Sequence, residues 1–235
     1  MPKMFRELPI ARIAHRTFFS LVSALPARLA PGVMARLFNR RFSHGSPWPY
    51  KSCPYEAAKR AALLSEISPD ARIILEVGAA DGHNLLAVAS HAKESAIIGI
   101  DISQKACEIA QVNTRNHAHV RVENTDLSTL MDTHPWLRGS VDTVIVSEVL
   151  YYLGGYKSTS AQLKLLGNLL AEDGQIILIH GSEDAERLHM RLAEILNLRP
   201  LREYRKNALG RNFLVTSLGR SRARRAEPVP AAAQG

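Results

Sequence analysis

The segment 76–82, with the sequence EVGAADG, has the composition of a ligand-binding turn. Gly78 and Gly82 allow the backbone to approach a ligand closely and to enter a following helix tightly. A dinucleotide enzyme would have G-x-G-x-x-G here to cradle a pyrophosphate, whereas this chain has Gly78, Ala80 and Gly82. The turn also begins with Glu76, a carboxylate that repels phosphate. The pattern therefore favours a cofactor with an amino acid end.

Two further acids follow the next expected strands. Asp101 closes the apolar run 96–100, 25 residues after Glu76, where a carboxylate can accept hydrogen bonds from both hydroxyls of a ribose. Asp126 follows a weaker run at 118–122, where a carboxylate can accept from the exocyclic amine of an adenine. Each acid taken alone has a second interpretation as a loop or helix-cap residue. Three acids at three consecutive strand ends favour a shared ligand.

Together these residues resemble the class I S-adenosylmethionine-dependent methyltransferases. The resemblance makes 76–82 the cofactor loop, Asp101 the ribose ligand and Asp126 the acid on the adenine side. It implies S-adenosylmethionine as the cofactor. The residues that it places in cofactor binding are Glu76, Gly78, Ala80, Gly82, Asp101, Ile102, Asp126, Leu127, Ser147, Tyr55 and Lys59.

Within that superfamily the chain is most similar to the nodulation protein S (NodS) type, over residues 46–217. Ala80 departs from the superfamily pattern, in which a middle glycine is common, although alanine is acceptable for the NodS-like group. The residues that carry this closer resemblance are Trp48, Tyr55, Glu56 and Lys59, the segment 75–82 and, above all, the heptapeptide SEVLYYL at 147–153.

The resemblance implies methyl transfer to a nucleophile, in the family's best-known case an amine on a chitooligosaccharide. We therefore expect a small-molecule or saccharide acceptor, methylated on an amine nitrogen. The sulfonium is already activated, so alignment supplies most of the acceleration, and an ammonium acceptor must also lose a proton to a nearby base. Glu148 is the first candidate to orient the acceptor or act as base, followed by Tyr152 and His180. The alternatives are packing for Tyr152 and its neighbour Tyr151, and a polar strand end for His180.

The elements that must position these residues alternate along the chain. Apolar runs at 72–77, 96–100, 141–146 and 175–179 predict buried strands, and 118–122 predicts a weaker one. Helices are expected near 83–92, 103–115, 158–171 and 184–197. This alternation predicts an α/β fold, a doubly wound, mostly parallel sheet covered on both faces. Such a sheet binds ligands at the carboxyl ends of its strands, where the candidate residues stand.

Two more strands, at 201–204 and 212–217, are predicted around the turn-forming residues 207–210. They add an antiparallel edge and complete a seven-stranded, Rossmann-like sheet. We divide the chain into a helical arm at 1–45, the methyltransferase domain at 46–219 and a tail at 220–235. The tail is rich in Arg and then in Pro and Ala, has no core-forming pattern and is expected to be disordered.

The arm is basic and amphipathic. Residues 1–50 carry eight Lys and Arg against one Glu, within a chain of formal net charge +8. Apolar residues recur with helical spacing from Ile10 to Leu25 and again from Pro31. Three interpretations stay open for residues 1–41: packing on the domain or on a protein partner, contact with an anionic membrane surface, and a cleaved transit peptide. We expect a cytoplasmic protein, with peripheral membrane contact as one of these alternatives.

The segment 46–56, SPWPYKSCPYE, combines three aromatic residues with prolines ahead of a helix that runs to about Ser65. In this superfamily the preceding helix often covers the cofactor pocket. The aromatic residues therefore form either a lid or a plug that packs the helix onto the domain, and Lys59 or Arg60 is expected to face the cofactor carboxylate.

Several protein classes are disfavoured. Two lone cysteines offer neither a disulfide framework nor zinc-ligand spacing, no acid cluster follows the fourth strand, and His117 and His119 lack a third ligand nearby, so no metal is expected. The sequence has no run of 18 apolar residues, so no transmembrane helix is predicted. Adenine methyltransferases of nucleic acids usually show an Asn/Asp-Pro-Pro-aromatic turn at the place of 147–150, which this chain lacks. A nucleic-acid methyltransferase is the weakest alternative, after a catalytically silent cofactor-binding module recruited by its basic arm.

Overall fold

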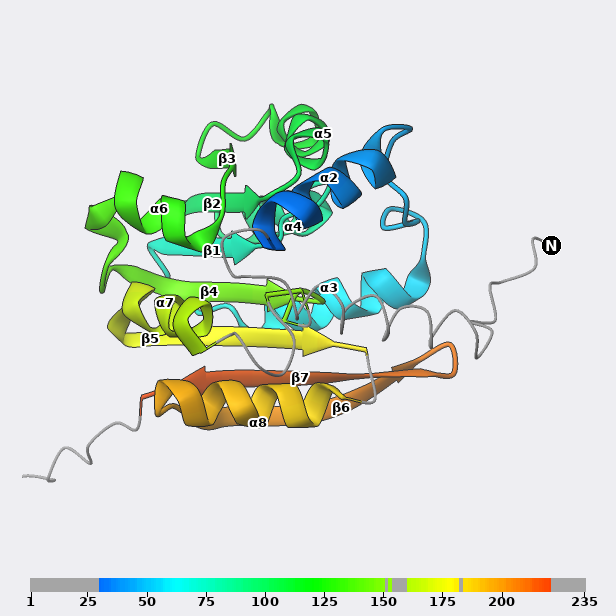
Figure 1. Cartoon of the computed structure of the whole chain (residues 1–235). Coiled ribbons are helices and arrows are strands. Elements are labelled where there is room, and N and C mark those ends of the chain that lie inside the picture. The colour runs from blue at the N-terminus through cyan, green and yellow to red at the C-terminus, as the bar shows by residue number, and fades with distance from the viewer. Residues whose placement is uncertain (1–29, 151, 154–159, 182–183, 221–235) are drawn as a thin grey trace, which may run out of the picture.

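The computed structural model describes residues 30–150, 152–153, 160–181 and 184–220. A seven-stranded sheet runs through this part of the chain in the order β3-β2-β1-β4-β5-β7-β6 (Figure 1). Strands β1 to β5 are parallel, β7 is antiparallel to β5, and β6 is antiparallel to β7. The predicted doubly wound, mostly parallel sheet is confirmed. Its strands are β1 (Ile73–Val77), β2 (Ala96–Asp101), β3 (Val120–Asn124), β4 (Val141–Ser147), β5 (Leu170–His180), β6 (Arg199–Ala208) and β7 (Arg211–Gly219).

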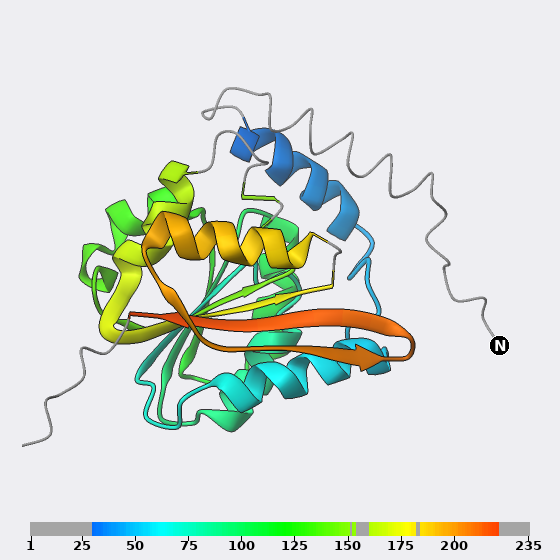
Figure 2. The ribbon, with the colours of Figure 1, turned by 90° about the horizontal axis from the view of Figure 1, so that it is seen from below.

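Helices cover both faces of the sheet (Figure 2). On one face, α3 (Pro54–Glu66), α4 (His83–His91) and α5 (Gln104–Thr114) bury one hydrophobic core. On the other, α6 (Leu127–Thr133), α7 (Ser160–Leu169) and α8 (Ala185–Leu196) bury a second, with the short 3-10 helix η1 (Pro135–Leu137) beside α6. The strands read as continuous apolar runs because alternate side chains enter one core or the other, as Ile74 and Leu75 do.

Helix α2 (Ala30–Phe42) lies upstream of this alternation and packs against α5 near the carboxyl end of the sheet (Figure 1). The Asn39 side chain fixes the contact, because its Oδ1 accepts from Ser103 Oγ at 2.9 Å and from the Lys105 N–H at 3.1 Å. The helix predicted from Pro31 onward is thus present. The helix predicted at 10–25 lies outside the described residues, as does most of the tail.

The β6–β7 hairpin is longer than predicted. Its two-residue turn has Leu209 at φ 55° and Gly210 at φ 76°, the left-handed pair that matches the twist of a hairpin. β6 is an edge strand with almost every side chain exposed. Its sequence is therefore mostly polar and lacks the apolar pattern from which the full length of a strand can be predicted. Helices α6 and η1 were not predicted, because each is too short to show a periodic apolar face.

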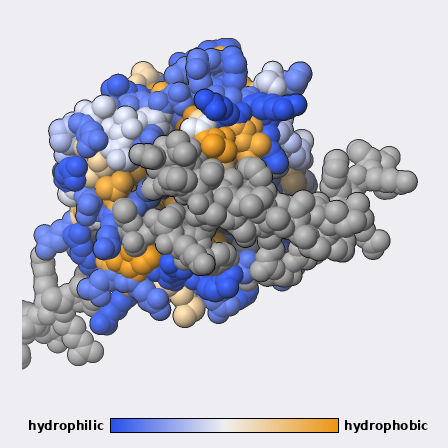
Figure 3. Space-filling view, viewed as in Figure 1, coloured by the Kyte–Doolittle hydropathy of each residue, from blue (hydrophilic) through white to orange (hydrophobic). Residues whose placement is uncertain are grey.

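The surface of the described residues is largely hydrophilic on the face seen in Figure 3, with apolar atoms in separate patches. None of the described helices combines the length and the apolar composition needed to cross a membrane. The large exposed hydrophobic residues of the described part of the chain are Val33, Val112, Trp136, Met190, Leu201 and Leu209.

Candidate active site

The turn after β1 is shaped by glycines at both ends. Gly78 has φ 77° and Gly82 has φ 80°, both in the left-handed region. A Cβ on Gly78 would lie 2.6 Å from Val149 Cγ2, and one on Gly82 would lie 2.9 Å from Ala110 Cβ. Ala80 between them also has a positive φ, 49°. The backbone therefore passes close to the turn after β4 and to α5, with no room for larger residues at its two ends.

Asp101 ties this turn to the end of β2. Its Oδ2 accepts from the Ala80 N–H at 2.9 Å, and its Oδ1 accepts from the Ser103 N–H at 2.8 Å. Burial raises the pKa of Asp101, and these two hydrogen bonds counteract part of the rise. Ile102, half-buried, follows directly. The carboxylate stands at the place expected of a ribose ligand, and its oxygens retain lone pairs for further donors.

Glu76 is buried in the sheet, with 1% of its surface exposed. Its Oε1 accepts from Asn84 Nδ2 at 2.8 Å, and its Oε2 is buried with no hydrogen-bond partner among the described residues. Burial raises the pKa of Glu76 to about 8. The carboxylate form of this buried, unpaired group is costly, so the group keeps its proton until a cationic donor brought by a ligand stabilises the ionised form at Oε2.

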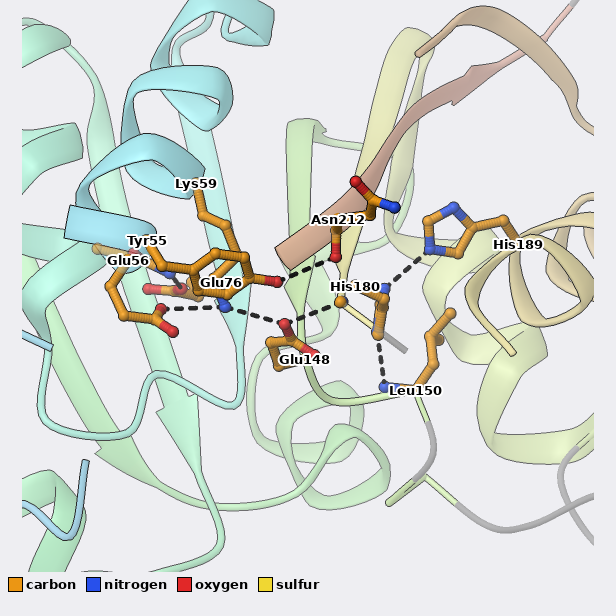
Figure 4. Close-up of polar contacts among 11 residues, drawn as sticks. Tyr55, Glu56, Lys59, Glu76, Glu148, Leu150, His180, His189 and Asn212 are labelled. Carbon is orange, nitrogen blue, oxygen red and sulfur yellow. Dashed lines mark hydrogen bonds and ion pairs between the residues drawn. The ribbon is translucent and has the colours of Figure 1, made fainter. Parts of the chain in front are cut away.

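On the acceptor side, Glu148 follows β4 in a left-handed conformation, with φ 55°. Its Oε1 lies 2.9 Å from Lys59 Nζ and accepts from the Gly181 N–H at 3.0 Å (Figure 4). Lys59, in α3, also lies 3.0 Å from Glu56 Oε2. Burial lowers the pKa of Lys59, but the two carboxylates outweigh that effect and hold the pKa above its usual value. With both acids ionised, the three described side chains Glu56, Lys59 and Glu148 sum to one negative charge.

His180 ends β5 and is fully buried. The Leu150 N–H donates to its Nε2 at 3.2 Å, and its Nδ1 lies 2.8 Å from His189 Nε2 (Figure 4). Burial lowers the pKa of His180 to about 4. Both ring nitrogens are therefore engaged inside the protein, which favours a positioning role over direct proton transfer.

Aromatic residues gather between α2 and the acceptor side. Tyr152 packs edge-on against Phe38 at 5.2 Å between ring centroids, and Trp48 packs against Phe42 and Tyr50, each at 5.8 Å. Burial, followed by the charge of Asp81, raises the pKa of Tyr50. The contact of Trp48 with Phe42 joins the segment 46–56 to α2, and its role as a lid or a plug stays a prediction. Tyr151 lies outside the described residues.

Tyr55 anchors α3 to the hairpin. Its ring is buried edge-on against Phe213 at 5.6 Å, and its hydroxyl donates to the Asn212 carbonyl oxygen at 3.3 Å. The guanidinium of Arg211, on β7, lies 4.1 Å from the centroid of the Tyr55 ring. A Cβ on Gly181 would collide with the Tyr55 hydroxyl. These contacts make Tyr55 part of the packing behind Glu148.

Asp126 caps α6, since its Oδ1 accepts from the Ser128 N–H at 2.8 Å and from the Thr129 N–H at 3.0 Å. The helix-cap interpretation of this acid is therefore realised in the structure. Leu127 beside it is buried in the core, and Ser147 is the half-buried last residue of β4.

The family of the chain follows from comparison with known proteins. The family model for Nodulation protein S (NodS) matches residues 31–192, more than half of the chain. The protein belongs to the NodS family. The resemblance stated from the sequence is confirmed, and with it the methyltransferase class of the family.

Three proteins similar to this NodS-family chain illustrate the relationship. It is 26% identical over 144 residues to Nodulation protein S of Rhizobium tropici, an alignment that covers 60% of this chain but 58% of that protein. It is 27% identical over 152 residues to Nodulation protein S of Azorhizobium caulinodans, covering 63% and 69%. The crystal structure of N-methyltransferase NodS from Bradyrhizobium japonicum WM9 with S-adenosyl-l-homocysteine superposes with a TM-score of 0.61 at 21% identity, covering 78% of this chain and 96% of that one. The last comparison establishes the fold.

The NodS match begins within α2, upstream of residue 46, where the sequence resemblance began. Sequence reasoning missed two residues that complete the site: Asn84, which holds Glu76, and His189, which holds His180. Glu56, which holds Lys59, was named from the sequence only as part of the NodS resemblance. The signal for His189 was its place in the buried stripe of α8, four residues after Ala185 and three before Leu192.

Proposed function

We propose that this protein transfers the methyl group of S-adenosylmethionine to an amine nitrogen of a small-molecule or saccharide acceptor. One observation carries the proposal: the turn that bears Glu148 lies directly against the cofactor turn, with Val149 filling the space beside Gly78. A carboxylate that can hold an amine thus adjoins the place where the methyl donor would bind.

The residues present fit the cofactor. Gly78 and Gly82 hold the turn tightly against Val149 and Ala110, and Glu76 Oε2 has no partner among the described residues, so the ammonium of S-adenosylmethionine would supply its donor. Asp101 would hold the ribose, and Ile102 and Leu127 would line the adenine side. Asp126 would accept from the adenine amine with the lone pairs that its helix-cap hydrogen bonds do not use. When bound, the cofactor supplies a methyl group activated as a sulfonium.

The cluster around Glu148 suits a cationic acceptor. Glu148, Glu56 and Lys59 together carry one net negative charge in a partly buried position, which attracts an ammonium group. Lys59 forms ion pairs with both carboxylates, so in this arrangement its ammonium group is not directed at the carboxylate of the cofactor. Glu148 would orient the acceptor nitrogen and receive the proton that the ammonium releases, so that the lone pair faces the methyl group. Tyr152 would line the same side, and His180 would act through the backbone of the turn.

The domain is best taken to begin at α2. The hydrogen bonds of Asn39 to the start of α5 and the contact between Phe38 and Tyr152 make α2 part of the site's cover. We therefore propose 30–219 as the working domain, in place of 46–219. Contact of the upstream residues with a membrane or protein partner stays a prediction.

Two measurements test this function. Isothermal titration with S-adenosylmethionine should show binding, and a screen of amine and saccharide acceptors with labelled cofactor should reveal methyl transfer. Glu148→Gln, which keeps the shape of the side chain, should lower kcat/KM about 100-fold or more while cofactor affinity stays within about twofold. Tight cofactor binding without transfer to any amine or saccharide would favour the catalytically silent module. Transfer by Glu148→Gln at the wild-type rate would refute the assigned role.

A further inference from the structure

A chain of hydrogen bonds runs from the acceptor-side turn through three buried side chains to an exposed residue on the edge strand β6. The Leu150 N–H donates to His180 Nε2 at 3.2 Å, and His180 Nδ1 lies 2.8 Å from His189 Nε2 (Figure 4). His189 Nδ1 lies 2.8 Å from Thr216 Oγ1, whose hydroxyl donates to Glu203 Oε2 at 3.0 Å. The four side chains come from β5, α8, β7 and β6. The chain thus spans every element between the turn and the edge strand.

The two ends of this chain determine where each proton lies. A backbone N–H can only donate, so Nε2 of a neutral His180 holds a lone pair and its proton sits on Nδ1. That proton is donated to His189 Nε2, which leaves the proton of His189 on Nδ1, directed at Thr216. The ionised Glu203 can only accept, which matches the hydroxyl that donates to it. Hydrogen-bond donation thus runs in one direction from Leu150 to Glu203, and each bond polarises the next.

Burial keeps both imidazoles neutral, as this arrangement requires. Burial lowers the pKa of His180 to about 4, and burial together with the neighbouring His180 lowers the pKa of His189. Thr216 is also fully buried, so its hydroxyl depends on these two partners. Loss of one member would leave a buried polar group without its partner.

The turn that receives this chain is strained and is held by three consecutive residues. Ile179 accepts from the Glu148 N–H at 2.9 Å, Gly181 donates to Glu148 Oε1 at 3.0 Å, and His180 accepts from the Leu150 N–H. Glu148 has φ 55°, a conformation that persists only when its surroundings hold it. Of the three anchors, His180 alone acts through a side chain, whose orientation depends on His189.

We propose that His189 and Thr216 are positioning residues for methyl transfer, which act through His180 to hold the turn at 148–150 and hence the Glu148 carboxylate. Neither side chain has a contact with the cofactor turn or with Glu148 among the interactions of the described residues. The inference rests on the proposed role of Glu148, but the state of the hydrogen-bond chain can be measured without any substrate.

The test uses the full-length protein with Thr216→Val, which removes the hydroxyl and keeps the shape of the side chain. Thr216→Ser restores the hydroxyl, and Ser217→Ala is the matched control, because the Ser217 hydroxyl binds Glu66 on the opposite face of β7. Thr216→Val should lower kcat about tenfold or more, with the KM for S-adenosylmethionine within about twofold. Thr216→Ser should recover most of the loss, and Ser217→Ala should leave kcat near the wild-type value.

Two substrate-free readouts accompany the kinetics. Hydrogen exchange at the Leu150 amide should be at least about tenfold faster in Thr216→Val, and nitrogen-15 shifts of the wild-type histidines should show the proton on Nδ1 of both His180 and His189. A proton on Nε2 of His180, or unchanged exchange in Thr216→Val, would overturn the inference. An equal loss of kcat in Ser217→Ala would also overturn it, because the effect would then be general. If the wild type methylates no acceptor, the proposed function fails, whereas the exchange and tautomer results still decide whether the chain exists.

Discussion

Lys59 and Glu148 are 89 residues apart in the sequence, yet Lys59 Nζ lies 2.9 Å from Glu148 Oε1. The pair joins α3, which precedes the first strand, to the turn after β4. It brings a buried cation into the site and balances one of two acids there. The position of the proposed acceptor carboxylate therefore depends on a helix that lies outside the alternating α/β pattern.

Lys59→Met should destabilise the protein by about 2 to 3 kcal/mol, because it leaves Glu56 and Glu148 facing each other without the cation. Urea denaturation measures the free energy of unfolding. In the double variant Lys59→Met with Glu148→Gln, the loss should be smaller than the sum of the two single losses, since the interaction is already removed. Strict additivity would show that the pair contributes nothing.

Asp101→Ala should weaken S-adenosylmethionine binding about 10- to 150-fold, the equivalent of about 1.5 to 3 kcal/mol for a lost charged acceptor. The substitution also leaves the N–H groups of Ala80 and Ser103 without their acceptor, which loosens the cofactor turn. Isothermal titration measures the affinity. Asp101→Asn, which keeps one carbonyl oxygen, should lose less, and an affinity within twofold of wild type for Asp101→Ala would contradict the ribose assignment.

Gly78→Ala should abolish measurable cofactor binding, and Gly78→Val should do the same, because a Cβ there meets Val149 at 2.6 Å and the left-handed φ of 77° disfavours any side chain. Shortening the Val149 side chain provides the control. Val149→Ala combined with Gly78→Ala should restore part of the affinity, leaving a penalty of about 1 to 2 kcal/mol for the backbone conformation. Wild-type affinity in Gly78→Val would mean that the turn does not face the cofactor.

The buried histidines should make stability depend on pH. The unfolded chain binds protons on imidazoles of ordinary pKa 6.5, whereas burial lowers the pKa of His180 to about 4 in the folded protein. Between these values the unfolded state holds more protons, so the free energy of unfolding falls as the pH drops below 6.5 and is fully recovered above it. Each imidazole contributes up to about 1.4 kcal/mol per pH unit.

Glu76 acts in the opposite direction, because burial raises its pKa to about 8 and the folded state then holds the extra proton between pH 4.5 and 8. Glu76→Gln removes this contribution. Unfolding measured at pH 7.5, 6.5 and 5.5 should therefore show a steeper loss on acidification in Glu76→Gln than in the wild type. Parallel curves for the two proteins would contradict the raised pKa of Glu76.

Removal of the upstream residues should have two separable effects. Deletion of residues 1–29, which carry five Lys and Arg against one Glu, should leave cofactor affinity unchanged. Deletion of residues 1–41 also removes Phe38 and Asn39 and should weaken binding, because their contacts with Tyr152 and α5 are lost. If the upstream segment meets anionic lipid, full-length protein should float with anionic vesicles at low salt and the 30–235 form should not. Equal flotation of both forms would eliminate the membrane interpretation.

The strands and most helices could be predicted because their residues follow the physics of a covered sheet. The run 73–77 is apolar apart from Glu76 because both of its faces are buried, and Asp101 closes its strand as the pattern indicates. The contact between His180 and His189 could not be predicted, because it depends on how α8 packs on β5. The role of Asp126 as a cap was an alternative that pattern alone left undecided, since a capping acid and a ligand-binding acid occupy the same position.

The strand order has a consequence for how the protein is made. β7, the last of the described strands along the sequence, lies between β5 and β6, and it supplies Thr216 to the hydrogen-bond chain and Asn212 to Tyr55. A nascent chain on the ribosome can thus form strands β1 to β5 long before it can complete the region behind the acceptor side. Until residue 219 has emerged, the edge of β5 stays unpaired and open to association with other strands. Release of a chain that stops before β7 would therefore yield an aggregation-prone product, and the region behind the acceptor side becomes complete only once β7 has emerged.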